Sequence, residues 1–426
     1  MEPVTFAVIG LGSRGKNSYG REILRMHGRA KVVAIADTDA ERLSIMGEEH
    51  SVPSSMRFTS AQELFAQPKL ADAAIICTQD RQHVPHAVMA LEKGYDVLLE
   101  KPISPDLKQL QELVRVQKKT GRRVVVCHVL RYTPFFRLFK TTIDSGILGR
   151  IIAIEATENV VYWHQAHSFV RGNWRREDET SPMILAKCCH DLDYLVWLSG
   201  QKCSRVSSFG SLSFFRSENA PEGSTDRCLG GCLAKKDCPY DCEKIYLTNE
   251  RTGVLKGKTG WPCDTLTETV DEAHVRAALE TGPYGRCVFR CDNDVVDHQM
   301  VNMEMEDGAT LSLNMCAFTE KGGRTIRVMG TLGDMYGDMS DNIVHIRPFG
   351  KEEKVVDVKT LSDNIKGHGG GDRGILESFI SLLEGKDADP SVTTLETSVE
   401  SHLIALAAEE SRKNGGMPVE ISGLRQ

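Results

Sequence analysis

The chain has 426 residues, of which 41% are hydrophobic and 26% charged, and its formal net charge is −7. This length predicts two domains or three, and there is enough apolar material for full cores. The acidic balance disfavours nucleic acid and membrane surfaces as partners. No stretch approaches the roughly 20 apolar residues of a membrane span. The first residues are too polar for an export signal, so we expect a cytoplasmic protein with reduced cysteines.

A glycine-rich turn follows the first apolar run. Residues 5–9 form a strand pattern, the sequence G-L-G-S-R-G follows, and a helical pattern then continues to residue 24. In this register the glycines permit a tight turn, close approach of a pyrophosphate and close packing of helix on strand. The amide groups at the helix start can bind phosphates. The predicted dinucleotide-binding residues of this turn are Gly10, Gly12, Ser13, Arg14 and Gly15.

The second strand pattern, residues 31–36, ends at Asp37. An acid at this strand end is placed for the hydroxyls of an adenosine ribose. Asp39 adds negative charge where the 2′-phosphate of NADP would lie, so the sequence favours NAD over NADP. Arg14 tempers this preference, since it could partner either form.

Further strands at 73–77, 96–99 and 123–127 alternate with helices, so residues 1–127 are predicted to form a doubly wound Rossmann domain of the α/β class. Ligands of such sheets lie beyond the carboxyl ends of the strands. Lys101 follows one of these ends, and partial burial readily adapts a lysine to proton transfer. The plain alternative is a strand-ending turn with a surface lysine.

Four motifs occur in a fixed order: G-L-G-x-R-G, then T-x4-H from Thr78 to His83, E-K-P from Glu100 to Pro102, and H-x-L-R-Y from His128 to Tyr132. Together they resemble the Gfo/Idh/MocA oxidoreductases, named for glucose–fructose oxidoreductase, inositol dehydrogenase and a rhizopine-catabolism protein. The resemblance covers nearly the whole chain. It implies a Rossmann domain followed by an α+β domain with a large, mostly antiparallel open sheet that binds substrate.

The same resemblance implies roles for individual residues. Lys101 assists proton transfer and contacts substrate or ribose hydroxyls, and the Lys101–Pro102 peptide is expected to be cis. Further cofactor contacts are expected at Thr78, His83 and Glu100. A homo-oligomer, dimer or tetramer, is expected from the open sheet of the family.

Residues 128–350 form the predicted substrate domain. The stretch 160–167 is dense in aromatic and imidazole groups, which suit the faces and hydroxyls of sugars. An aromatic strand edge is the structural alternative. The residues predicted to bind substrate in this domain are Arg131, Tyr132, His164, His167, Trp174, Arg175 and Asp191.

A second chemical centre lies in the segment 182–195. His190 matches the catalytic histidine of the family, and a histidine is a suitable base because its ordinary pKa lies near neutral pH. Ala186 stands where the family usually has an aspartate. Lys187 shares a helix face with His190 and is our candidate for the missing polar role. The structural alternative for His190 is a packing histidine.

Four cysteines lie within fifteen residues, at Cys228, Cys232, Cys238 and Cys242. Thiolates suit tetrahedral zinc, but this spacing lacks the usual C-x2-C pair. We therefore favour free thiols and predict no bound metal, with a structural zinc site or redox-labile disulfides as the alternatives. Further along, Asp294, Asp297 and His298 are interpreted as strand caps, with a place in the site as the alternative.

The chain's last part contains two turn predictions and a tail. The glycines at 330–334 and Gly337-Asp338 indicate hairpin turns. Residues 351–426 are expected to pack back on both domains. Within them His368 lies in a glycine-rich loop as a candidate substrate contact, and Asp372 is predicted to be the N-cap of the following helix.

These features predict an NAD-dependent oxidoreductase that transfers a hydride between nicotinamide and a hydroxyl carbon of a sugar, sugar derivative or cyclitol. Its catalytic residues are Lys101, His190 and Lys187. The missing aspartate and the cysteine-rich second domain keep open a redox-neutral NAD-dependent glycoside hydrolase, which oxidises, eliminates and re-reduces. A non-catalytic dinucleotide-binding sensor is a third class, which the intact lysine and histidine disfavour.

Overall fold

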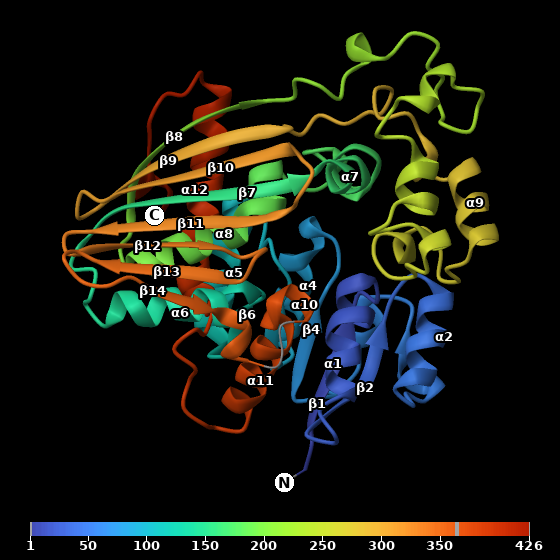
Figure 1. The fold of residues 1–426 in the computed structure, drawn as a ribbon. Helices are drawn as coiled ribbons and strands as arrows, with labels where there is room; N and C mark the ends of the chain where they lie inside the picture. Colours follow the sequence, from blue (N-terminus) through green and yellow to red (C-terminus); the bar gives the residue numbers. More distant parts are fainter. Residues whose placement is uncertain (1, 363–365, 426) are drawn as a thin grey trace.

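The computed structural model describes residues 2–362 and 366–425. Its first sheet has six parallel strands in the order β3-β2-β1-β4-β5-β6 (Figure 1). The strands are β1 (Val4–Ile9), β2 (Ala30–Ala36), β3 (Arg57–Phe58), β4 (Ala73–Ile76), β5 (Asp96–Leu99) and β6 (Val124–Val126). The helices between them are a π-helical segment (Ser13–Gly20), α1 (Arg21–Leu24), α2 (Ala40–Glu49), α3 (Ala61–Ala66), α4 (His83–Glu92) and α5 (Leu107–Thr120). This confirms the predicted Rossmann fold.

The second sheet has nine strands in the order β14-β13-β12-β11-β7-β10-β9-β8-β15. Its strands are β7 (Ile151–Val161), β8 (Cys203–Ser211), β9 (His298–Met305), β10 (Thr310–Thr319), β11 (Gly323–Gly330), β12 (Gly333–Asp338), β13 (Ile343–Pro348), β14 (Lys354–Asp357) and β15 (Val419–Glu420). Only β7 and β10 pair in parallel among these described strands. The predicted, mostly antiparallel open sheet is therefore confirmed.

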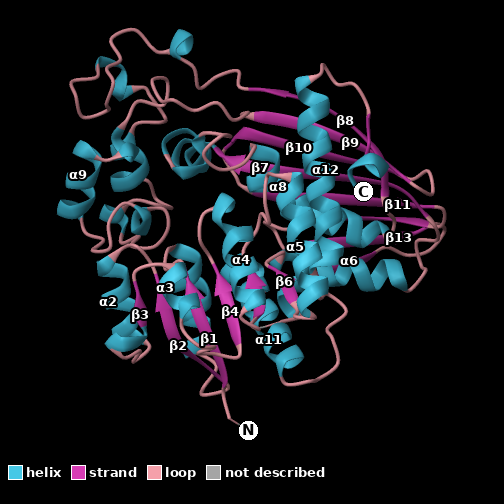
Figure 2. Ribbon diagram, turned by 180° about the vertical axis from the view of Figure 1, so that it is seen from behind, coloured by secondary structure: helices cyan, strands magenta, loops and turns pink. Residues whose placement is uncertain are grey.

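Helices cover one face of this sheet. They are α6 (Pro134–Asp144), α8 (Met183–Ser199) and α12 (Leu395–Lys413), seen in front of the strands in Figure 2. Alternate residues of β7, such as Ile154 and Ala156, are buried on this side. The opposite face carries no helix in Figure 1, and large apolar side chains, including Ile152, Phe209 and Met300, are exposed on the strands.

One predicted turn is wrong. Gly337 and Asp338 lie within β12, paired with β11 and β13, instead of forming a hairpin. A Cβ atom at Gly337 would lie 2.8 Å from the ring of Phe135 and 3.0 Å from that of Phe139. The glycine therefore leaves space beside the strand for two aromatic rings of α6. In the sequence, such a glycine cannot be distinguished from one in a turn.

The tail joins both domains. After α10 (Lys366–Gly369), helix α11 (Gly371–Leu383) places Phe379 against Phe6 of β1, with ring centroids 6.2 Å apart. Helix α12 packs on α8. The prediction of Asp372 as an N-cap is wrong, because Gly370 precedes the helix and the Asp372 carboxylate turns to Arg14, at 2.8 Å. Within the described residues, no helix has the length and apolarity needed to cross a membrane.

The connection between β8 and β9, residues 212–297, forms a separate unit that we call the cysteine-rich segment. It has a small hydrophobic core of its own around Tyr246, Val275 and Leu279, and it includes helix α9 (Glu272–Thr281). In Figure 1 it lies over α1 and α2 of the Rossmann domain. Glu268 of this segment pairs with both Lys16 and Arg42, so the segment is tied to the Rossmann domain by charge.

Candidate active site

Lys101 leaves the end of β5 and meets helix α8. Its Nζ donates a hydrogen bond to the carbonyl oxygen of Ala186 over 2.9 Å. The Lys101–Pro102 peptide is cis, as expected from the resemblance. Because Ala186 stands one turn before His190 on α8, the Lys101 amine contacts this helix one turn before the imidazole.

His190 is buried, with 6% of its surface exposed. Burial, followed by the charge of Lys101, lowers the pKa of His190 well below its ordinary value. Its ring lies 5.8 Å from that of His128 and 6.3 Å from that of His368, measured between centroids. Its Nδ1 is buried without a hydrogen-bond partner among the described residues. The side chain is thus a neutral imidazole at neutral pH, able to accept a proton.

Lys187 enters a chain of ion pairs behind this site. Its Nζ lies 3.1 Å from Glu158, whose other oxygen lies 2.6 Å from Arg324. Arg324 in turn binds both oxygens of Asp191, at 2.7 and 3.1 Å. Asp191, predicted to contact substrate, is completely buried in this network. It therefore holds Arg324 in place instead of reaching toward a ligand.

The two predicted substrate residues of the H-x-L-R-Y motif are also turned inward. Arg131 binds Asp193 through two hydrogen bonds of 2.6 Å, and both side chains are buried. The Tyr132 hydroxyl accepts a hydrogen bond from the Thr393 amide at 3.2 Å. Burial raises the pKa of Tyr132 to about 12. The buried contacts of this motif, including the pair between Arg131 and Asp193 of α8, thus stabilise the position of that helix.

The imidazoles after β7 take different positions. His164, in the short helix α7 (Tyr162–His164), packs against Trp261, with centroids 4.7 Å apart. Burial, followed by the charge of Lys187, lowers the pKa of His164 well below its ordinary value.

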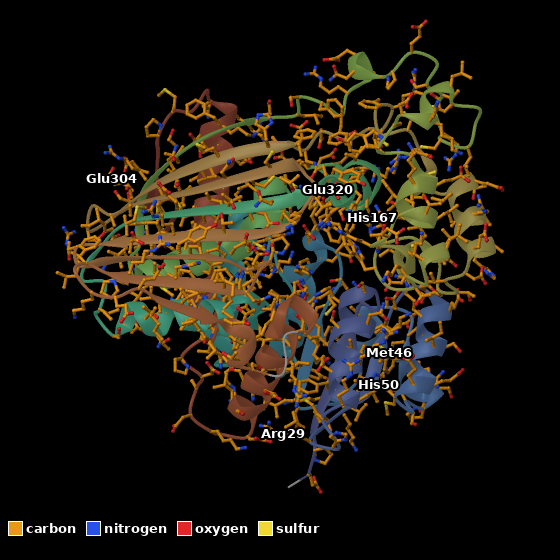
Figure 3. All side chains as sticks on the ribbon, in the orientation of Figure 1. Arg29, Met46, His50, His167, Glu304 and Glu320 are labelled. Carbon is orange, nitrogen blue, oxygen red and sulfur yellow. The ribbon has the colours of Figure 1, made fainter. Side chains whose placement is uncertain are left out.

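His167 faces the cysteine-rich segment, where Figure 3 labels it near the end of the nine-stranded sheet. Its ring nitrogens contact the Tyr246 hydroxyl at 2.8 Å and the Thr265 hydroxyl at 3.1 Å. Burial lowers the pKa of His167 to about 3. Two further candidates are likewise engaged: the Trp174 indole donates to Asp80 at 3.1 Å, and Arg175 pairs with Asp292 at 3.0 Å. All three side chains thus contact other parts of the chain.

The glycine loop has the shape that a dinucleotide requires. Gly10 has φ +87°, and a Cβ there would lie 2.6 Å from the backbone of Cys77. A Cβ at Gly15 would lie 2.0 Å from the Gly10 oxygen, whereas one at Gly12 would meet nothing within 4 Å. The loop is therefore closely packed at Gly10 and Gly15 and open at Gly12. The helix of residues 13–20 begins directly after Gly12, so a pyrophosphate fits there.

Asp37 lies at the end of β2 as predicted. Its carboxylate accepts hydrogen bonds from the Leu11 amide at 2.6 Å and the Asp39 amide at 2.9 Å. The carboxylate is thus fixed beside the glycine loop, where it could hold the ribose hydroxyls.

Arg14 joins three parts of the chain. Its guanidinium lies 2.6 Å from Glu100, 2.8 Å from Asp372 and 3.4 Å from the Nδ1 of His368. His368 also contacts Asp372 at 3.0 Å. The side chain of Arg14 therefore ties the glycine loop to the E-K-P turn and to α11, and brings His368 to the site.

His83 supports the E-K-P turn from below. It is almost completely buried, and its two ring nitrogens lie 2.6 Å from the Pro102 oxygen and 2.9 Å from the Thr78 oxygen. The Thr78 hydroxyl contacts His86 at 3.1 Å. These contacts fix the ends of β4 and β5 relative to each other.

Sequence reasoning missed several residues of this region. Glu158 and Arg324 are charged positions inside alternating strand patterns, a signal that could have drawn attention to them. Asp264, which accepts from Asn17 at 3.1 Å, and Glu268 reach the glycine-loop helix from the cysteine-rich segment. No local pattern marks these two, because their partners are some 250 positions away.

Comparison with known proteins agrees with this geometry. Residues 4–128 match the model of an oxidoreductase family described as an NAD-binding Rossmann fold, and residues 140–421 match that family's C-terminal alpha/beta domain. The chain belongs to the Gfo/Idh/MocA oxidoreductase family. The family match confirms the prediction of an oxidoreductase with a dinucleotide-binding domain.

Individual relatives are distant. YteT of Bacillus subtilis, which is named as an oxidoreductase, is 23% identical over 398 residues, covering 89% of this chain and 88% of YteT. Inositol 2-dehydrogenase 4 of Saccharopolyspora erythraea is 31% identical over 225 residues, or 51% of this chain and 60% of the relative. The structure of the WlbA dehydrogenase from Bordetella pertussis, in complex with NADH and UDP-GlcNAcA, superposes with a TM-score of 0.69 at 18% identity, covering 98% of each chain.

Proposed function

We propose that this protein transfers a hydride between NAD and a hydroxyl carbon of a sugar, sugar derivative or cyclitol. The observation that carries the proposal is the position of Lys101, whose Nζ binds the Ala186 carbonyl one helical turn before the buried His190. The inositol dehydrogenase relative and the sugar nucleotide of the WlbA complex support a polyhydroxylated substrate. The cysteine-rich segment places an aromatic wall, with Trp261 against His164, beside these groups.

The residues of the chain supply the proton chemistry. The ammonium of Lys101 keeps hydrogen-bond donors beyond the one given to Ala186, and these can orient the reacting hydroxyl. His190 is neutral because burial and the Lys101 charge lower its pKa, so it can take the hydroxyl proton. The nicotinamide ring, when bound, accepts the hydride from the same carbon. The ion-pair chain from Lys187 to Asp191 holds the helix that carries His190.

Two acids support NAD as the preferred cofactor over NADP. Asp37 is fixed beside the glycine loop at the end of β2, where it repels a 2′-phosphate. Glu268 pairs with Lys16 and Arg42, the nearby cations that such a phosphate would need. The site therefore has a carboxylate that can accept hydrogen bonds from the ribose hydroxyls, and its nearby cations are already paired with Glu268.

A panel of sugars, cyclitols and glycosides tests the reaction. We expect NADH to accumulate when the protein receives NAD and its polyol, and we expect Lys101→Ala to lower this rate by roughly 10²- to 10⁴-fold. Release of an aglycone with NAD required and no net NADH would instead identify the redox-neutral glycoside hydrolase. Dinucleotide binding without turnover of any compound would identify a sensor. Full activity of Lys101→Ala would refute the assignment of this lysine.

The open face of the nine-stranded sheet supports a homo-oligomer. Ile152, Phe209 and Met300 are exposed on its strands, and a second copy of the chain would bury them. Light scattering at micromolar concentration should report a dimer or tetramer, and a monomer would contradict this part of the proposal. None of the thirteen cysteines forms a disulfide within the described residues, and this suits a reducing compartment, which supports a cytoplasmic location.

A further inference from the structure

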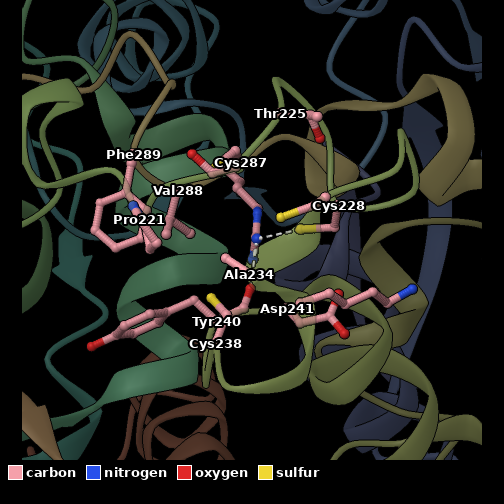
Figure 4. A pocket seen from close by; sticks show the side chains of 14 residues that line it. Pro221, Thr225, Cys228, Ala234, Cys238, Tyr240, Asp241, Cys287, Val288 and Phe289 are labelled. Carbon is pink, nitrogen blue, oxygen red and sulfur yellow. Dashed lines mark hydrogen bonds between the residues drawn. The ribbon is translucent and has the colours of Figure 1, made fainter.

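Thiols gather around one cavity in the cysteine-rich segment, away from the groups assigned to the reaction. Figure 4 shows this cavity, which has a volume of about 20 Å³. Its cysteines and charged residues are Arg171, Cys228, Cys232, Lys235, Cys238, Asp241 and Cys287. Four thiols from stretches as distant as 228 and 287 thus meet at one point of the fold.

Cys228 lies at the centre of the densest group. The sulfur atoms of Cys228 and Cys242 and a carboxylate oxygen of Asp241 all lie within 4.8 Å of one another, and all three residues are buried. Zinc binds sulfur at about 2.3 Å and carboxylate oxygen at about 2.0–2.2 Å, so two ligands of one ion lie roughly 4 Å apart. The spacing of the three groups is therefore close to that of a metal site.

A buried cation provides the second observation. The Arg171 side chain is 1% exposed; its Nε donates to the Arg286 oxygen and its Nη2 to the Tyr240 oxygen, each at 2.7 Å. Nη2 also lies 3.5 Å from the Cys228 sulfur, and Nη1 has no hydrogen-bond partner among the described residues. No ion pair joins Arg171 to a carboxylate within the described chain. A buried charge of this kind is costly unless negative charge faces it.

We propose that the cysteine-rich segment holds a structural zinc ion on Cys228, with Cys242, Asp241 and one further thiol of the cavity wall as the other ligands. Binding releases the protons of the thiols to solvent, and the resulting thiolates and carboxylate leave a net negative charge around the ion. This charge compensates Arg171. The segment is made of short helices and loops around a small core, and a unit of this kind commonly needs a metal to be stable.

Metal analysis of the full-length protein tests the site. After purification in reducing buffer and washing with a chelator, we expect about one equivalent of zinc per chain and sulfur-rich coordination by X-ray absorption. Less than about a tenth of an equivalent, or coordination by nitrogen and oxygen alone, would overturn the proposal. If the protein contained iron and acid-labile sulfide instead of zinc, the proposal would be wrong and the site would hold an iron–sulfur cluster.

Two matched variants assign the ligand. Cys228→Ser should retain less than about a tenth of the wild-type zinc, since serine is a poor ligand for this ion. Cys263→Ser should retain the wild-type content, because the buried Cys263 thiol of the same segment already donates to the backbone oxygens of Thr252 and Tyr246, at 3.1 and 3.5 Å. Equal zinc content in both variants would contradict the assignment.

A spectroscopic measurement covers the case in which Cys228→Ser does not fold. Co²⁺ exchanged into the wild-type protein should give the thiolate charge-transfer absorption and the intense visible bands of tetrahedral coordination. Absence of both features in protein that binds cobalt stoichiometrically would overturn a thiolate site. None of these readouts depends on turnover, so their outcome is independent of the proposed reaction.

Discussion

The Nζ of Lys101 donates to the backbone oxygen of Ala186 over 2.9 Å, at the position where the family resemblance leads one to expect an aspartate side chain. The amine is thus held by a main-chain carbonyl, which, unlike a carboxylate, does not change its charge with pH. His190 follows one turn later on the same helix, and its pKa is lowered by burial and by this lysine. The proton chemistry that we propose therefore uses a lysine and a histidine without the aspartate that the family resemblance implies.

His190→Gln should lower kcat/KM by roughly 10²- to 10⁴-fold with little change in dinucleotide affinity. The base must be neutral to work, and its pKa is well below 6.5 in the folded protein. We therefore expect the activity of the wild-type protein to stay level as pH falls through 6.5, and to drop only at lower pH. The pH dependence of kcat/KM measures this limb.

His345→Gln is the control for that variant. His345 lies on β13 of the open sheet, where it contacts Glu353 at 2.9 Å, so its replacement should leave both rate and pH profile unchanged. An unchanged rate in His190→Gln would remove this histidine from the mechanism.

Glu268→Ala should relax the preference for NAD. Its carboxylate pairs with Lys16 and Arg42, and its removal frees both cations for a 2′-phosphate. Charge-assisted hydrogen bonds contribute about 1.5–3 kcal/mol each, so NADP affinity should rise by at least about tenfold relative to NAD. Titration with both dinucleotides by calorimetry gives the ratio. Glu272→Ala removes a surface partner of Arg276 in the same segment, and it should leave the ratio unaltered.

Arg131→Met tests whether this arginine supports the fold or contacts substrate. Both it and Asp193 are buried, so loss of the guanidinium leaves an uncompensated carboxylate and should lower the free energy of unfolding by about 3–5 kcal/mol. Arg137→Met breaks the more exposed pair with Asp389 and should cost less than about 1 kcal/mol. Equal unfolding free energies in urea, together with a raised KM in Arg131→Met, would favour substrate contact.

Stability should fall as the solution becomes acidic. Burial lowers the pKa of both His167 and His402 to about 3, whereas an unfolded histidine titrates near 6.5. Between these values only the unfolded chain takes up the proton, so each group costs about 1.4 kcal/mol per pH unit as pH falls from 6.5 toward 3. At pH 5 each should have lost about 2 kcal/mol relative to pH 7.5.

His402→Gln checks that prediction. The Nε2 of His402 accepts from the Ile103 amide at 2.8 Å, so the variant should be less stable than the wild type at pH 7.5. It should nevertheless lose less stability between pH 7.5 and 5, because one titrating group is gone. Urea unfolding at both pH values gives the two differences, and an identical loss in both proteins would contradict the account.

The sequence by itself determined the Rossmann domain and the position of Lys101, and the open sheet was implied by the family resemblance of its motifs. The first two follow from short-range patterns: apolar runs, a glycine loop in register and a motif directly after a strand. Gly10 at φ +87° and Asp37 beside the loop occupy the positions that such patterns predict.

Only the tertiary structure decided which polar residues are free to act. Arg131 and Asp191 were predicted to face substrate, yet each is paired with a residue at least 62 positions away in the chain, Asp193 and Arg324. Glu268 reaches the glycine loop from 252 positions away. The local sequence shows that a residue is charged, but tertiary packing determines which residue pairs with it and compensates the charge. For that reason the cluster around Cys228, with Arg171 beside it, became a metal-site hypothesis only in the folded chain.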